Sequence, residues 1–157
     1  MNQSISVLMV CLGNICRSPL AEGVLKKLLT EKRITNWIVD SAGIGGWHEG
    51  DLPDQRAIRV AKNHSIDITG QRARQIQRQD FSQFDHILVM DMENMRDALK
   101  ISPLQHASKI RMIMDFKYPG KGIIVPDPYY TNRFEESFQL IMEGCEAFLE
   151  QEIVDRS

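Results

Sequence analysis

The chain has 157 residues, with 19 lysines and arginines against 21 aspartates and glutamates, so its formal net charge is −2 at pH 7. Hydrophobic residues make up 43% of it, and we expect one globular domain, 1–157, with a sizeable core and no partner chain. The charge argues against nucleic acid or an anionic membrane surface as the main partner. We expect neither a signal peptide nor a membrane anchor. Three cysteines without metal-site spacing fit a reducing compartment, and cytoplasmic localisation is the default expectation.

A buried strand is predicted at 5–10, and a turn and a helix follow it directly. The turn reads Cys11-Leu12-Gly13-Asn14-Ile15-Cys16-Arg17-Ser18. Across such a turn Cys11 and Arg17 can face each other, while backbone N–H groups and the helix N-terminus point at one small anion. We expect Gly13 and Asn14 to supply the positive φ angles of a tight loop. The same field favours the thiolate form of Cys11, and the fork of Arg17 matches two phosphate oxygens.

A buried cysteine at the end of a strand is common in protein cores, so Cys11 alone does not indicate a nucleophile. Its combination with Arg17, Ser18 and the Gly13-Asn14 pair at these spacings favours a cradle for an anion.

The helix after the turn carries a broad apolar stripe. Ser18 and Pro19 are predicted as its N-cap and first helical residue, and Glu22 is expected to complement the helix dipole. A short strand at 37–39 leads into a glycine-rich loop at 41–46. That loop lies at the carboxyl end of its strand, where a parallel sheet forms its ligand crevice.

The rest of the chain continues the alternation of helices and strands. Pro53 is predicted to open a second helix, 86–90 is a buried strand, and Asp91 is the N-cap of the next helix. The fourth strand is predicted at 110–113, and a final amphipathic helix places Cys145 in the core. The pattern predicts an α/β fold: a central four-stranded parallel sheet with helices on both faces, of flavodoxin-like or Rossmann-like type.

The turn from Cys11 to Ser18 resembles the signature loop of the low-molecular-weight protein tyrosine phosphatases. The resemblance covers nearly the whole chain and implies a single phosphatase domain, with the phosphate-binding loop between strand 1 and helix 1. Further matching segments are Asp40-Ser41-Ala42-Gly43, Trp47, Pro53-Asp54-x-Arg56-Ala57, Ala73-Arg74-Gln75, Met90-Asp91-x-x-Asn94 and Asp127-Pro128-Tyr129.

The resemblance implies a role for each polar group of the predicted site. Cys11 is expected to attack phosphorus and form a phosphocysteine, and Arg17 to bind the phosphoryl group. Asp127 is expected to protonate the leaving group and then activate water, although a Pro-Asp-Pro run by itself is more typical of a rigid turn. No cofactor or metal is needed for this chemistry. The other residues expected to bind the phosphate are Leu12, Gly13, Asn14, Ile15, Cys16 and Ser18.

Ser41 is implied to hydrogen-bond toward the phosphate-binding loop and to support it together with Asn14 and Ser18. The family commonly has histidine where this sequence has Gln71. That departure bears on how strongly the phosphate-binding loop is supported, and not on the catalytic residues. Core or surface roles are expected for the histidines, none of which has metal-ligand spacing: His48, His64, His86 and His106.

Trp47, Tyr129 and Tyr130 are expected to form the aromatic rim of the cleft, and Ile15 an apolar wall. Deep aromatic walls admit a phenyl phosphate and reach poorly to phosphoserine. We therefore expect phosphotyrosine-containing proteins as substrates, and phosphate and other oxyanions as inhibitors. Related enzymes that act on phosphoarginine carry threonine where this chain has Ile15, so the comparison disfavours that substrate.

Cys16 allows two interpretations: it packs beneath the loop, or it traps oxidised Cys11 in a disulfide. Two rival functions also use an anion cradle. Arsenate-reducing relatives of this fold add resolving cysteines, and none lies between Cys16 and Cys145. A module that only binds phosphorylated ligands would need Arg17 but neither Cys11 nor Asp127.

Overall fold

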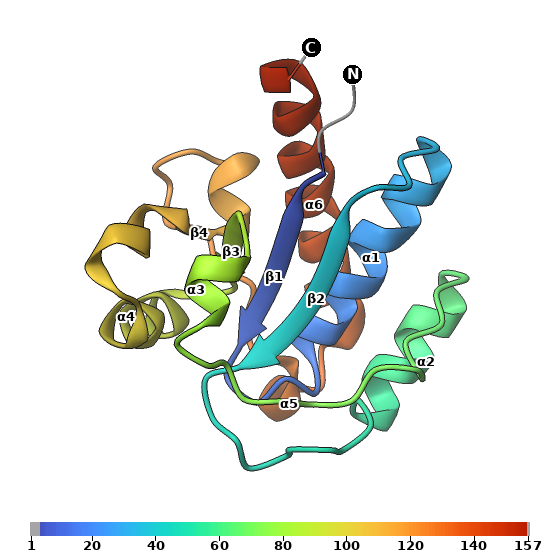
Figure 1. The fold of residues 1–157 in the computed structure, drawn as a ribbon. Helices are drawn as coiled ribbons and strands as arrows, with labels where there is room; N and C mark the ends of the chain where they lie inside the picture. Colours follow the sequence, from blue (N-terminus) through green and yellow to red (C-terminus); the bar gives the residue numbers. More distant parts are fainter. Residues whose placement is uncertain (1–3, 157) are drawn as a thin grey trace.

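The computed structural model describes residues 4–156 and contains one parallel sheet of four strands in the order β2-β1-β3-β4 (Figure 1). The strands are β1 (Ser6–Cys11), β2 (Ile38–Gly43), β3 (His86–Val89) and β4 (Ile110–Met112). All three pairings between neighbouring strands are parallel. The predicted α/β class and four-stranded sheet are therefore confirmed.

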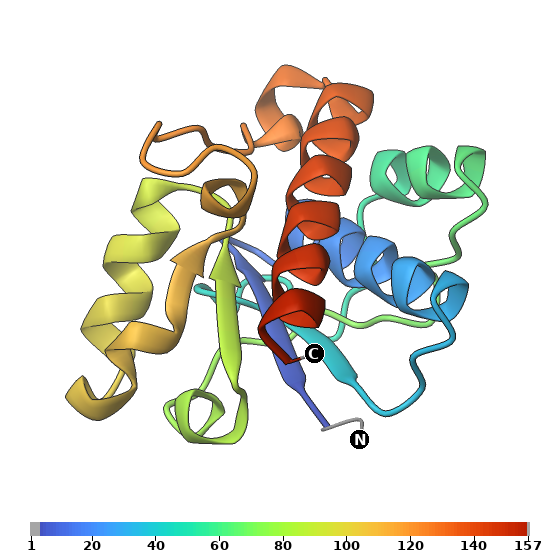
Figure 2. The same cartoon turned by 90° about the horizontal axis from the view of Figure 1, so that it is seen from above.

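Helices cover both faces of the sheet (Figures 1 and 2). On one face, α1 packs against β1, β2 and α6, and α2 contacts both α1 and α6. On the other face, α4 packs against β3 and β4. The α-helices are α1 (Arg17–Glu31), α2 (Gln55–Asn63), α3 (Asp80–Gln83), α4 (Met92–Ile101), α5 (Pro128–Thr131) and α6 (Phe134–Arg156), and the 3₁₀ turns are η1 (Leu104–Lys109) and η2 (Ile113–Phe116).

The central strand β1 is buried on both faces because its side chains alternate between two apolar clusters. Val7 and Met9 join the cluster that includes residues of α1 and α6. Leu8 and Val10 join the cluster on the α4 side. Side chains of any strand alternate between its two faces, and because both faces are covered here, β1 is apolar and buried from Val7 to Cys11.

β1 is also the strand at which the strand order of the sheet reverses. The chain passes from β1 to β2 on one side, and β3 pairs with β1 on the other. Ligands of open α/β sheets bind beyond the carboxyl ends of the strands at such a point. The stretch from Cys11 to Ser18, which we call the phosphate loop, begins at this edge.

Two boundaries near this edge differ from the prediction. β2 continues through Gly43, so the first part of the expected glycine-rich loop is strand. Ser41, Ala42 and Gly43 pair in register with the last residues of β1, and this pairing outweighs the local glycine signal. The prediction of Ser18 as N-cap is also wrong, because α1 begins at Arg17 with Cys16 at the N-cap position.

The remaining differences are small. Asp54, not Pro53, leads into α2, and its carboxylate accepts a hydrogen bond from the Arg56 N–H at 2.8 Å. The predicted N-cap Asp91 is confirmed, and Cys145 is fully buried as expected. No helix within residues 4–156 combines the length and the apolar character needed to cross a bilayer.

Candidate active site

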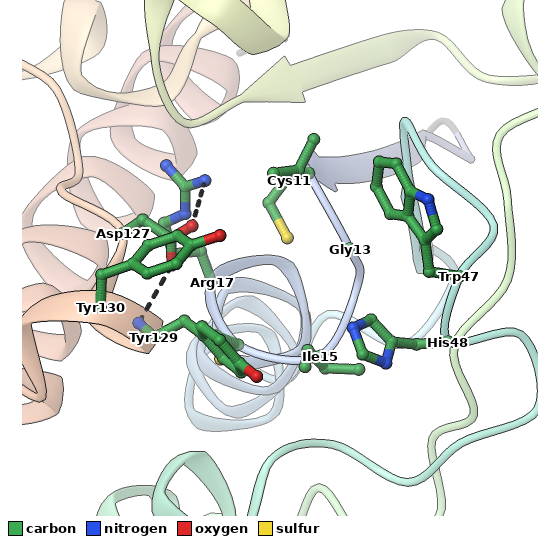
Figure 3. A pocket seen from close by; sticks show the side chains of 11 residues that line it. Cys11, Gly13, Ile15, Arg17, Trp47, His48, Asp127, Tyr129 and Tyr130 are labelled. Atoms are coloured by element: carbon green, nitrogen blue, oxygen red, sulfur yellow. Dashed lines mark hydrogen bonds and ion pairs between the residues drawn. The ribbon is translucent and has the colours of Figure 1, made fainter.

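A pocket of about 290 Å³ opens at the carboxyl end of β1. In Figure 3 the Cys11 sulfur points into it, with Arg17 and Asp127 on one side and Trp47 and His48 on the other. The pocket brings together the phosphate loop, the connection after β2 and the start of α5. Its lining residues are Cys11, Leu12, Gly13, Ile15, Cys16, Arg17, Trp47, His48, Asp127, Tyr129 and Tyr130.

The backbone of the phosphate loop has hydrogen-bond donors to spare. Within the described part of the chain, no N–H of residues 12–16 donates to another protein group. Asn14 has a φ of 58°, as expected, whereas Gly13 does not take the left-handed conformation that the sequence suggested for it. The loop rests on Gly43, where a Cβ would lie 2.9 Å from the Gly13 carbonyl carbon. Free N–H groups next to a helix N-terminus form a binding site for an anion.

The Asn14 side chain closes the loop on two neighbouring segments. This residue is only 2% exposed. Its Nδ2 donates to Ser18 Oγ at 2.7 Å and to Ser41 Oγ at 3.0 Å. Its Oδ1 accepts a hydrogen bond from the Arg74 N–H at 3.0 Å. Both N–H bonds and the oxygen of the Asn14 amide therefore hold the loop.

Ser18 does not cap α1. Its hydroxyl group faces Cys11 instead. The Ser18 Oγ lies 3.1 Å from the Cys11 Sγ. Asn14 donates to the same oxygen, and the hydroxyl proton has two acceptors in reach, the sulfur and the Ala42 carbonyl oxygen at 3.5 Å, of which the sulfur is the nearer. A hydrogen bond donated to sulfur favours the thiolate over the thiol.

The support continues from Ser41 to a buried carboxylate. Ser41 donates to Glu22 Oε1 at 2.7 Å, and Glu22 Oε2 pairs with the Lys26 ammonium at 2.6 Å. Glu22 lies beyond the first turn of α1, so its predicted dipole role is wrong and it braces the loop instead. Gln71 still reaches this network: its Nε2 donates to the Pro19 carbonyl at 3.0 Å, and its Oε1 lies 3.5 Å from Ser41 Oγ.

The Arg17 guanidinium is fixed by three oxygen partners. Its Nη1 contacts Asp91 Oδ2 at 2.6 Å and the Val125 carbonyl at 3.0 Å, and its Nη2 lies 3.5 Å from Asp127 Oδ2. Burial by itself would lower the pKa of Arg17, but the charge of Cys11 and the hydrogen bond and charge of Asp91 raise it above its usual value. Arg17 therefore stays charged while its side chain is almost completely buried.

Asp127 belongs to a more open segment, residues 125–132, which we call the Asp127 segment. The Asp127 side chain is 26% exposed, against 3% for Arg17. Its Oδ1 accepts a hydrogen bond from the Tyr129 N–H at 3.1 Å, and so it caps α5. The rings of Tyr129 and Tyr130 meet edge to face, 5.2 Å apart, and both are exposed at the rim, as Trp47 is on the opposite side.

Cys16 is buried and also borders the pocket. Burial raises the pKa of its thiol, and the negative charges of Cys11, Asp54 and Asp127 act in the same direction. The uncharged thiol is therefore the dominant form. The packing and disulfide interpretations of Cys16 both fit this position.

Some pocket and support residues were not identified from the sequence. His48 lines the pocket with Nδ1 3.3 Å from Asp51 Oδ2, although the sequence suggested only a core or surface role. Asp91 was recognised as a helix cap and not as a partner of Arg17. The signal that could have identified His48 is its neighbour Trp47, which the sequence does predict at the rim of the cleft.

Among residues 4–156, no three His, Cys, Asp or Glu side chains gather as they would around a metal ion.

Known proteins match this chain over nearly its full length. The family model described as low molecular weight phosphotyrosine protein phosphatase matches residues 6–156. The Bacillus subtilis low molecular weight protein-tyrosine-phosphatase YfkJ is 44% identical over 92% of this chain and 94% of its own. The crystal structure of YfkJ superimposes with a TM-score of 0.94 at 40% identity, covering 99% of both chains. The Sus scrofa low molecular weight phosphotyrosine protein phosphatase is 44% identical over 93% of this chain and 94% of its own. The chain therefore belongs to the low molecular weight phosphotyrosine protein phosphatase family.

Proposed function

We propose that this protein hydrolyses phosphotyrosine, and small aryl phosphates, through a phosphocysteine on Cys11. One observation carries the proposal: the Cys11 sulfur lies at the floor of a pocket lined by unpaired loop amides, the Arg17 guanidinium and the Asp127 carboxyl group. The amides and Arg17 provide the binding site for the three outer phosphate oxygens. Asp127 lies on the side where the ester oxygen of a bound substrate would leave.

In the first step the Cys11 thiolate attacks phosphorus in line with the ester oxygen. The S–P bond forms and the P–O bond to tyrosine breaks. Asp127, in its protonated form, transfers its proton to the departing phenolate oxygen. A phenolate whose conjugate acid has a pKa of about 10 is a poor leaving group, so this transfer contributes roughly 10²–10⁴-fold. Arg17 and the loop amides bind the transferring phosphoryl group in the transition state.

In the second step water replaces the phenol. The Asp127 carboxylate takes a proton from the attacking water, the new P–O bond forms and the S–P bond breaks, which releases inorganic phosphate. The Ser18 hydroxyl, 3.1 Å from the sulfur, stabilises the departing thiolate. The loop residues already named as phosphate-binding serve both steps through their backbone N–H groups, with Asn14, Ser18 and Ser41 holding the loop in shape.

The pocket walls favour phosphotyrosine over phosphoserine. Trp47, Tyr129 and Tyr130 stand at its rim and Ile15 forms part of its side, so a flat phenyl ring can lie between them. A phosphoserine phosphate is closer to its own backbone and reaches the sulfur poorly. Peptides of matched sequence should therefore show a strong preference for phosphotyrosine, and equal turnover of the two would contradict the selectivity.

An aryl phosphate assay tests the proposal directly. We expect a stoichiometric burst of phenol as the phosphocysteine forms, followed by steady turnover, with inorganic phosphate and other oxyanions as competitive inhibitors. A binding module would give no burst. Phosphoarginine and arsenate, assayed in parallel with thiol reductant, test the two alternatives that use the same cradle, and preferential turnover of either would overturn the proposal.

We also propose a cytoplasmic monomer that acts on phosphotyrosine-containing proteins. Support comes from the three cysteines, which are all free thiols.

We propose a redox role for Cys16 as well. Peroxide oxidises the Cys11 thiolate to a sulfenic acid, and the Cys16 thiol displaces water from it to form a disulfide. Activity lost to peroxide should then return with thiol reductant, and Cys16→Ser should lose most of this recovery. Unchanged recovery would leave only the packing role.

A further inference from the structure

Arg56 lies outside the pocket and links three parts of the molecule that form it. Its Nε and Nη2 donate to the two oxygens of Asp54, each at 3.0 Å. These bonds lower the pKa of Asp54 below its usual value. The Asp54 N–H in turn donates to the Ile15 carbonyl of the phosphate loop at 2.8 Å. The guanidinium is therefore anchored at the N-terminus of α2, on a residue whose backbone binds the phosphate loop.

The other edge of the same guanidinium faces the Asp127 segment. Arg56 Nη1 lies 3.4 Å from the Tyr129 carbonyl and donates to Asn132 Oδ1 at 3.2 Å. Its Cζ is 5.4 Å from the centre of the Tyr129 ring and 4.7 Å from that of the Phe134 ring. Arg56 therefore contacts both ends of α5 and the first residue of α6.

The segment has separate anchors before and after Asp127. Before it, Arg17 binds the Val125 carbonyl and Ser137 binds the Pro126 carbonyl at 3.0 Å each. After it, Arg56 supplies the side-chain contacts described above. Asp127 caps α5 through the Tyr129 N–H, so a shift of this short helix would move its carboxyl group. The position of Asp127 thus depends on an anchor on each side.

We propose that Arg56 is a positioning residue for proton transfer: it holds α5 so that the Asp127 carboxyl group and the Tyr129 wall stand over Cys11. The inference rests on the proposed function and deepens it. Arginine is needed because one planar fork must bind both oxygens of Asp54 while its remaining N–H groups reach α5. Lysine offers one compact ammonium and cannot make both sets of contacts.

The test is how the rate of phosphocysteine formation, measured as the burst at saturating substrate, depends on the leaving group, because the later hydrolysis is the same for every substrate. In Arg56→Gln we expect this rate to fall about tenfold for tyrosine phosphate, because misplacing an acid weakens its proton transfer. For an aryl phosphate with an acidic leaving group, which needs no proton, the rate should stay within about twofold of the wild type. Arg56→Lys should show the same selective loss with tyrosine phosphate as Arg56→Gln. In the Asp127→Ala background, Arg56→Gln should have no further effect.

A matched control and a second variant keep the test independent of folding. Arg59 is exposed on the same helix, and Arg59→Gln should leave both activities unchanged. Asn132 has a φ of 63°, so Asn132→Gly keeps the left-handed backbone and removes only the oxygen that Arg56 binds. It should show the same dependence on the leaving group, more weakly.

An equal loss with both leaving groups, or no loss at all in Arg56→Gln, would overturn the proposal. A failure of the proposed function looks different: the wild type would not turn over aryl phosphates, or Asp127→Ala would not discriminate between leaving groups.

Discussion

The phosphate loop and the Asp127 segment meet in one pocket but are held in very different ways. Asn14, Arg17 and Ser18 of the loop are at most 2% exposed, and side chains from β2 and from the start of α4 bind them. In the Asp127 segment, Tyr130 is 78% exposed. The site that binds the phosphoryl group is thus built into the core, while the proposed proton donor is partly exposed, on a segment that reaches the surface. Phosphate binding and proton transfer should therefore respond separately to mutation.

The largest effect is expected from Cys11→Ser. Turnover of tyrosine phosphate should vanish, because the hydroxyl is a far weaker nucleophile than the thiolate. Phosphate binding, measured by calorimetry, should persist, since the loop amides and Arg17 are unchanged. Circular dichroism should show an intact fold. If this variant no longer bound phosphate, the loop would need the sulfur in order to bind the anion, and binding would not be a property of the amides and Arg17 alone.

Asp127→Ala should come next. We expect the rate of phosphocysteine formation from tyrosine phosphate to fall roughly 10²–10⁴-fold, and to fall much less for an aryl phosphate with an acidic leaving group. Phosphate affinity should change little, because Asp127 contributes no donor to the anion. A uniform loss across leaving groups would remove Asp127 as the acid.

The pH profile sharpens the same point. Turnover requires a deprotonated Cys11 and a protonated Asp127, so the optimum of the wild type should lie on the acid side of neutral. Asp127→Ala should lose the decline on the basic side of the profile for phosphocysteine formation from tyrosine phosphate, while the acid side remains. A basic decline that survives the mutation would assign it to another group.

A smaller effect is expected from Asn14→Gly, which tests the loop without touching the Asp127 segment. Glycine keeps the positive φ but removes three hydrogen bonds and leaves buried polar groups without partners. We expect the free energy of unfolding to fall by about 1–3 kcal/mol and phosphate to bind about tenfold more weakly. The loss in the rate of phosphocysteine formation should be the same for all leaving groups. A loss that depends on the leaving group would mean that the two segments are coupled.

The smallest effect is expected far from both segments, at the start of β3. Burial lowers the pKa of His86, although its Nε2 lies 2.9 Å from Glu152 Oε1, outside hydrogen-bonding geometry. The unfolded chain therefore binds a proton at higher pH than the folded one, so stability is lost as pH falls below about 6.5. Thermal unfolding of His86→Gln should show less of this decline and unchanged kinetics. An identical decline in both proteins would exclude His86 as its source.

Local sequence patterns predicted the elements that form the site but not the contacts that hold them. The strand, turn and helix around Cys11 were predictable because their signals lie within one short stretch. The pattern predicts Ser18 as a helix cap because serine commonly caps helices, whereas its hydroxyl group here faces the Cys11 sulfur. The sequence suggests helix-terminus roles for Glu22 and Asp91, and Asp91 has that role. The partners that link the two residues to the site, Ser41 and Arg17, are distant in sequence.

The end of β2 shows the other limit. The run from Ser41 to Gly46 has the composition of a loop, yet its first three residues pair with β1. Whether a glycine continues a strand depends on the strand beside it, and that neighbour is about thirty residues earlier in the chain. Arg56 was visible only as part of a family motif, because its contacts reach α5 from the other half of the chain.

The close seat of the phosphate loop on Gly43 has a consequence for how this scaffold could be altered. A methyl group there would come within 2.9 Å of the Gly13 carbonyl carbon and 3.0 Å of the Asn14 nitrogen. The backbone path of the phosphate loop is therefore constrained by the adjacent strand and not only by the loop itself. A substitution at position 43 would displace the loop backbone, so the anion site can be disturbed from that strand without changing any reacting group.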